Sequence, residues 1–293
     1  MTLEYLLSTP PWEWPEDAHD TILETLRNPR AQEDERRLAA ELAGDLVIMD
    51  DEMAEALLRI LTDPDEPEEL RGRSAIALGP ALEEGDTEGP DPDPDYLAVS
   101  IPVLQKASRA LRKVAEDADA PKLVRRMAME AAVRWPEAWQ DRVVRDAFRT
   151  GDPEWVMTSV FCMRWLGGFR DEVLEALDSD DPLILKEAIF AAGRQELDEA
   201  WPLMARFARA AGEGRTFLPD HPHAERDILF AVLETAPFIR PEETGDILID
   251  LLDVGDEEIR TAVSEALEWA NWTLEMDEED WGEEEPGDDR VWH

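Results

Sequence analysis

Apolar and polar positions follow one another along this chain with the period of amphipathic helices. Within 103–114, Leu104, Ala107, Leu111 and Val114 recur at spacings of three and four residues, which places them on one face of a helix. No segment shows a convincing strand pattern. The pattern therefore predicts an all-α protein.

One kind of segment recurs along the chain. In 70–79, "LRGRSAIALG", an apolar residue and an arginine are followed by small and apolar residues and a closing glycine. Comparable segments occupy 35–44, 70–79, 124–133, 156–165, 184–193, 225–234 and 259–268. Most intervals between them lie in the range of helical-hairpin repeats.

Each of these segments is predicted to be the second helix of a hairpin. Five of them are preceded by an Asp that can cap the helix, with a Pro or a carboxylate in the first turn after it. This order is typical of a helix start. The predicted first helices are the amphipathic runs at 19–26, 52–61, 103–114, 139–148, 171–177, 201–210 and 243–252.

The order of residues in 63–79, "DPDEPEELRGRSAIALG", resembles the HEAT repeat. The resemblance covers 19–274 and implies a right-handed α-solenoid of about seven HEAT/armadillo-like hairpins in one continuous domain. Segments 156–165 and 225–234 depart from the pattern: both lack the closing glycine, and Met157 stands in place of the arginine.

Several stretches fall outside the repeats. Residues 1–18 are expected to cap the first hairpin with Trp12 and Trp14. Insertion loops are expected at 83–95 and 211–223, and 275–293 is expected to be an acidic, disordered tail.

The charge is strongly negative, with 71 acidic and 29 basic residues and a net charge of −42. Such a field repels phosphate backbones and disfavours nucleic-acid binding. Only four of the basic residues are lysines, which fits a GC-rich genome or, as we favour, a salt-rich cytoplasm. With neither a long apolar run nor a signal peptide in the sequence, a cytoplasmic protein without membrane contact is expected.

Candidate chemistry is sparse, and no cofactor is expected. Cys162, the only cysteine, stands in an apolar helix and is expected to be a buried, inert thiol. His221 and His223 are weak metal candidates, with Glu225 and Asp227 in reach. Two histidines around a proline at the edge of a loop are more typical of loop residues, so no metal site is predicted.

One region is basic against the acidic background, because residues 106–149 carry 11 basic and 7 acidic side chains. Six of these cations form two stripes at i, i+3, i+7 spacing, which we call the basic stripes: Lys106, Arg109 and Lys113 on one helix, and Arg142, Arg145 and Arg149 on another. They serve either ion pairs to neighbouring acidic helices, the slightly favoured interpretation, or docking of an acidic segment of a partner or of the chain's own tail.

The tryptophans in and beside the repeats, among them Trp269 and Trp272, are expected to pack in the core or between repeats. An exception is the pair Arg164 and Trp165, which stands at the end of a second helix. If it is exposed on the concave wall, it is a candidate binding hot spot.

These patterns favour a non-catalytic scaffold or adaptor that binds another protein on its solenoid surface. The first alternative is an enzyme on the same scaffold, similar to a bilin lyase or a glycosylase, since HEAT-like folds host both. The second alternative is an acidic DNA mimic that inhibits nucleic-acid-binding proteins. The chain contains no His-Glu dipeptide, which argues against the metal hydroxylases of HEAT type.

Overall fold

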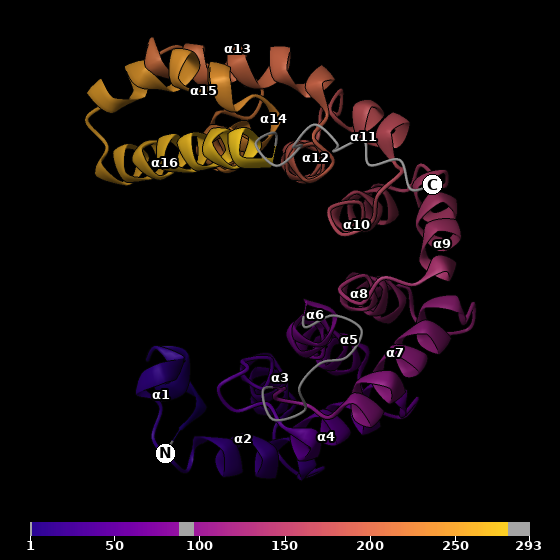
Figure 1. Cartoon of the computed structure of the whole chain (residues 1–293). Coiled ribbons are helices and arrows are strands. Elements are labelled where there is room, and N and C mark those ends of the chain that lie inside the picture. The colour runs from indigo at the N-terminus through magenta and orange to yellow at the C-terminus, as the bar shows by residue number, and fades with distance from the viewer. Residues whose placement is uncertain (1, 88–96, 281–293) are drawn as a thin grey trace, which may run out of the picture. The chain divides into compact units, whose positions relative to one another are not determined.

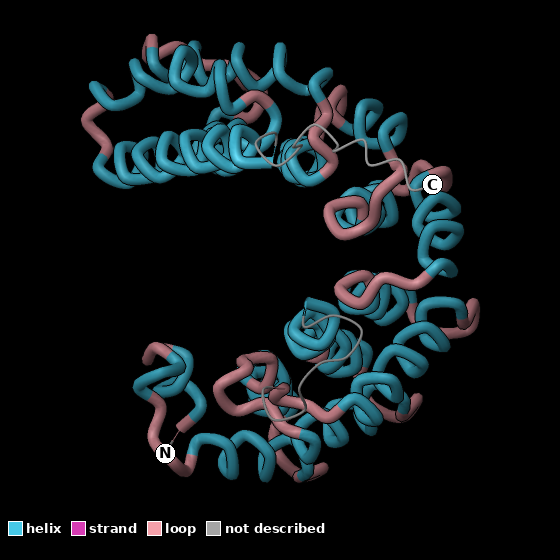
Figure 2. The backbone as a smooth tube through the Cα atoms, viewed as in Figure 1, coloured by secondary structure: helices cyan, strands magenta, loops and turns pink. Residues whose placement is uncertain are grey.

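The computed structural model describes residues 2–87 and 97–280. Within these ranges all regular structure is helical, and no strand is present (Figure 2). The predicted all-α class is therefore confirmed for the described part of the chain. None of the helices in this part is long and apolar enough to cross a membrane.

The chain divides into two compact units, one ending at Leu166 and the other starting at Gly167. The first unit holds α1 (Leu3–Leu7), α2 (Ala18–Arg27), α3 (Glu33–Leu42), α4 (Asp51–Thr62), α5 (Glu68–Ala77), α6 (Gly79–Thr87), α7 (Ile101–Glu116), α8 (Lys122–Ala132), α9 (Ala138–Phe148) and α10 (Pro153–Cys162). The second unit holds α11 (Arg170–Ala176), α12 (Pro182–Arg194), α13 (Trp201–Gly212), α14 (Glu225–Ile239), α15 (Pro241–Leu248) and α16 (Glu257–Asp280). Short 3-10 turns occupy Pro11–Glu13, Asp198–Ala200, Pro222–Ala224 and Ile249–Asp253.

Successive helices pack as pairs within each unit (Figure 1). In the first unit the pairs are α2 with α3, α4 with α5, α7 with α8 and α9 with α10, and the second members α3, α5, α8 and α10 contact one another in that order. In the second unit the pairs are α11 with α12, α13 with α14 and α15 with α16, and α12, α14 and α16 form the corresponding row. In the first unit the core lies between the first and the second helices of the pairs, where side chains such as Leu57, Leu70 and Ala128 are buried.

The arginine of the recurring segment has a repeated structural role. In three pairs its guanidinium donates to a backbone carbonyl in the last turn of the preceding helix, ten residues earlier in the chain. These bonds run from Arg36 to Leu26 (3.2 Å), from Arg71 to Leu61 (3.1 Å) and from Arg125 to Ala115 (3.3 Å). The last carbonyls of a helix lack partners within it and carry partial negative charge, so a cation satisfies both needs. The arginine thereby ties the two helices of a pair together.

The closing glycine permits a close approach between successive second helices. A Cβ on Gly44 would lie 3.2 Å from Ala77 Cα, and one on Gly193 would lie 2.7 Å from Cγ2 and 2.8 Å from Cβ of Thr235. The contacts at Gly193 are shorter than real Cβ atoms make, and the one at Gly44 would force the Ala77 backbone to shift by a few tenths of an ångström. The glycine is therefore a packing requirement of α3 against α5 and of α12 against α14.

The N-terminal segment packs on the first helix pair, although not as predicted from its tryptophans. Leu3 and Leu6 of α1 are buried, and Trp14 Nε1 donates to the carbonyls of Leu6 (3.0 Å) and Thr9 (2.8 Å). Trp12, in contrast, is 79% exposed. The first hairpin is thus capped by apolar residues of α1 together with Trp14, and Trp12 does not take part.

The loops and tail differ from their predicted limits. Residues 83–87 continue α6 and residues 275–280 continue α16, so neither stretch begins where predicted. Both runs contain good helix formers that extend a helix already started, at little cost per residue. The remainder of the predicted 83–95 loop and of the tail lies outside the described residues. The second loop begins after Gly212, and Phe217 packs on Phe207 with ring centroids 4.9 Å apart.

Candidate functional site

The basic stripes lie on α7 and α9, and part of their charge is used within the unit. Lys106 Nζ pairs with Glu55 of α4 at 2.5 Å. Arg142 bridges to Glu116 of α7 at 2.7 Å and to Asp146 at 3.6 Å, and Arg149 lies 4.0 Å from Asp146. For these three residues the geometry fits the ion-pair interpretation.

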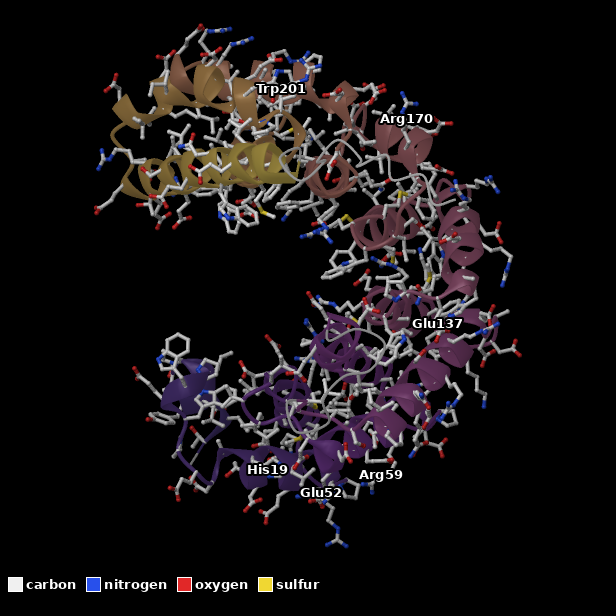
Figure 3. All side chains as sticks on the ribbon, viewed as in Figure 1. His19, Glu52, Arg59, Glu137, Arg170 and Trp201 are labelled. Atoms are coloured by element: carbon white, nitrogen blue, oxygen red, sulfur yellow. The ribbon has the colours of Figure 1, made fainter. Side chains whose placement is uncertain are left out.

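Two residues of the basic stripes remain available for binding a partner. Arg109 and Lys113 are exposed on α7 and have no ion-pair partner among the described residues, while Arg145 is half-buried on α9. The two helices are neighbours at Glu137, which is labelled in Figure 3. Its carboxylate accepts from Ser108 Oγ of α7 (2.8 Å) and from Trp139 Nε1 of α9 (2.7 Å). The acidic-partner hypothesis therefore depends chiefly on Arg109 and Lys113.

Other arginines of the 106–149 stretch stack on tryptophans. The guanidinium carbons lie over the rings of Trp139 (Arg112, 5.6 Å), Trp155 (Arg125, 5.1 Å) and Trp165 (Arg134, 4.9 Å). Such cation–π contacts stabilise by about 0.5–1 kcal/mol at exposed sites. All three tryptophans are half-buried, as expected for Trp139 and Trp155 from the packing role predicted for the repeat tryptophans.

The candidate hot spot Arg164–Trp165 follows the end of α10, where both side chains are half-buried. Arg164 lies over the ring of Phe161 at 5.6 Å, and the Trp165 ring is covered by Arg134, which also pairs with Glu83 at 2.6 Å. Trp165 therefore contacts the preceding helix pair and offers only part of its ring to a partner.

The chemically reactive candidates are placed as follows. Cys162 is buried, and burial, followed by the negative charge of Glu130, raises the pKa of its thiol well above the ordinary value. The rings of His221 and His223 lie 6.1 Å apart. Glu225 is occupied, because its Oε1 accepts from the backbone N–H groups of Phe217 and Leu218 at 2.7 Å each. Among the described residues, no group of three or more His, Cys, Asp or Glu side chains is arranged to hold a metal ion.

The expectation that all repeat tryptophans are packed is wrong for α16. Trp269 and Trp272 are each 50% exposed. Trp201 of α13, labelled in Figure 3, is in contrast buried, and its Nε1 donates to Glu243 at 3.1 Å. Phe238 of α14, 41% exposed, lies 6.1 Å from the Trp269 ring, which lies 5.3 Å from the Trp272 ring. We call these three residues the aromatic cluster.

The aromatic cluster borders a groove of about 490 Å³ lined by residues of α14 and α16, which we call the α14–α16 groove. Its apolar lining is Phe230, Leu233, Pro237 and Phe238 from α14, with Ala262, Ala266 and Trp269 from α16. Its polar lining is Glu234, Glu257, Glu258, Thr261 and Glu265. The groove thus combines an apolar floor with carboxylates and contains no basic residue.

The repeat pattern did not predict this groove, because the segment 225–234 ends before Phe238 and the tryptophans of α16 were expected to be packed. Phe230 and Phe238 stand eight residues apart, so they lie on one face of α14, and Trp269 and Trp272 share a face of α16. This aromatic spacing was a readable signal. Whether these two helix faces are buried depends on the elements that pack against them, and the sequence pattern does not predict those neighbours.

No family model matches this chain, and no curated protein matches it.

Proposed function

We propose that this chain is a non-catalytic scaffold or adaptor of the HEAT-like, right-handed α-solenoid type that binds another protein. The paired helices, the arginine bonds between paired helices and the glycine contacts between successive second helices support the repeat assignment. Repeat stacks of this kind present extended surfaces that suit partner binding.

The observation that carries this proposal is the aromatic cluster. Three large aromatic side chains, each 41–50% exposed, lie together at the mouth of an apolar groove. Contiguous exposed apolar surface marks interaction sites, and tryptophan is enriched among interface hot spots. The exposed Arg109 and Lys113 supply a second contact surface, suited to an acidic segment of the partner.

The two alternatives receive less support. An enzyme with a cysteine nucleophile needs an accessible thiol, whereas the only cysteine, Cys162, is buried and its thiol has a raised pKa. A DNA mimic needs carboxylates displayed on a polar face, whereas the carboxylates of the α14–α16 groove surround an apolar floor.

The test is affinity capture from native extract in 0.5 M potassium chloride by the wild-type chain and by F238S/W269S. Both substituted side chains are exposed, so the helical circular dichroism should persist. The wild type should capture a protein in stoichiometric amount. The captured amount should fall at least tenfold with the F238S/W269S variant. W12S, which removes an even more exposed tryptophan elsewhere (79% against 50% for Trp269), should retain the protein.

A second arm of the same test uses R109Q/K113Q to probe the basic stripes. Reduced capture supports a contact between these two residues and an acidic segment of the partner. Undiminished capture shows that Arg109 and Lys113 are not part of the partner-binding site. Equal capture by F238S/W269S and the wild type would overturn the proposed binding site.

A further inference from the structure

We propose that the α14–α16 groove binds a basic amphipathic helix of its partner, with apolar anchors on one face and Lys or Arg on both flanks. This inference rests on the proposed function, and it names the chemistry of the partner rather than the existence of one.

The apolar floor of the groove determines which anchor side chains the bound helix should carry. Leu233 and Ala266 supply aliphatic surface, and Phe230, Phe238 and Trp269 supply aromatic surface. Aliphatic or aromatic side chains gain about 25 cal/mol per Å² of apolar surface removed from water. A polar segment would leave this floor without that gain.

The carboxylates at the rim of the groove determine the charge expected of the bound helix. Glu234, Glu257 and Glu265 are exposed and have no ion-pair partner among the described residues, and Glu258 is held by Arg226. Unpaired carboxylates on both helices flank the floor, so a bound helix meets negative charge on either side. Lys or Arg on both flanks of the anchor face complements this arrangement, and Arg can also stack on Trp269 or Trp272.

The length of the groove fits a helix of about three turns. Phe230 and Phe238 are eight residues apart on α14, which corresponds to about 12 Å along the helix axis. A helix laid in an apolar groove contacts it through residues at i, i+3, i+4 and i+7, which span a similar distance.

Charge also argues against the other occupants. Residues 281–293 carry five carboxylates and one arginine, so the chain's own tail is repelled by the rim. A second copy would bring another acidic rim and a net charge of −42 against the first.

The probe is a synthetic 14-residue helix with leucines on one face and lysines on the other, labelled for fluorescence anisotropy and titrated with the full chain. Because any basic peptide is attracted to so acidic a protein, the titration is performed in 0.5 M potassium chloride, where the screening length is about 4 Å. We expect saturable 1:1 binding. The same peptide with glutamates in place of lysines should not bind.

Two charge-matched variants distinguish the groove from general attraction. E234Q/E257Q/E265Q removes three groove carboxylates, and E175Q/E242Q/D246N removes three exposed carboxylates outside the lining. We expect the affinity to fall at least fivefold in the first variant and less than twofold in the second. F238S/W269S should weaken binding at least tenfold.

Equal weakening in both charge variants, or absent saturation, would overturn this inference. A peptide of residues 281–293 that displaces the probe would assign the groove to the tail, and a dimer in light scattering that dissociates in F238S/W269S would assign it to a second copy. Either result overturns the proposal. Capture of a non-basic partner through the aromatic cluster would refute the inference and leave the proposed function standing.

Discussion

At the scale of single residues, Arg71 shows what the recurring arginine contributes to stability. It is only 7% exposed, and its Nε donates to the carbonyl of Leu61 at 3.1 Å. Arg71→Met keeps the apolar stem and removes the donor, leaving a helix-terminal carbonyl without its charged partner. We expect the free energy of unfolding to fall by about 1–3 kcal/mol, measured by urea denaturation.

The matched control is Arg59→Met on the preceding helix. Arg59 is exposed and its Nε reaches only the carbonyl of Glu55 within its own helix. A surface change of this kind should shift stability by less than about 0.5 kcal/mol. Equal losses in the two variants would contradict the interhelical role of Arg71.

The sequence identified Arg71 and its equivalents by position but not by partner. The acceptor is a main-chain carbonyl, which carries no signature in the side-chain pattern. The same limit applied to Trp269 and Trp272, since a helix face rich in aromatic residues looks identical in sequence whether it is covered or open. The basic stripes were easier to read, because the i, i+3, i+7 spacing of Lys106, Arg109 and Lys113 implies one helix face regardless of what lies opposite.

At the scale of helices, Gly193 tests the close approach of α12 and α14. A new Cβ would meet Cβ and Cγ2 of Thr235 at 2.8 Å and 2.7 Å, and a β-branched side chain in a helix has little freedom to move away. We expect Gly193→Ala to lower the free energy of unfolding by about 1–3 kcal/mol through overpacking, measured by urea denaturation.

Gly245→Ala in α15 provides the opposite control. Nothing lies within 4 Å of the Cβ it would add, so the gain in helix propensity should raise stability by about 0.5–1 kcal/mol. If both alanines stabilise the protein, the packing explanation of the closing glycine is wrong.

Helix positions were largely predictable, because start signals are local. Asp152 caps α10 and Asp181 caps α12 by accepting from backbone N–H groups of the first turn. Helix ends were less predictable. α6 and α16 run on into residues predicted as loop and tail, since neither an acidic run nor, in α6, the single glycine Gly85 by itself stops a helix.

At the scale of the whole molecule, the dominant property is the excess of 71 acidic over 29 basic residues. Much of the basic set is already engaged in short pairs, such as Lys106 with Glu55 and Lys122 with Asp152. Salt weakens those attractions slightly, but it also weakens the more numerous repulsions among the remaining carboxylates. Repulsion outnumbers attraction, so the net effect of salt on the folded state should be stabilising.

We therefore expect the melting temperature to rise from 0.01 M towards 1 M potassium chloride. The rise should be steepest at low salt, because the screening length shortens from about 30 Å at 0.01 M to about 8 Å at 0.15 M and about 3 Å at 1 M. Thermal unfolding followed by circular dichroism measures it, and sucrose at matched osmolality serves as a non-ionic control. A melting temperature that stays constant across this range would show that carboxylate repulsion does not limit stability, and it would remove the argument for a salt-rich cytoplasm.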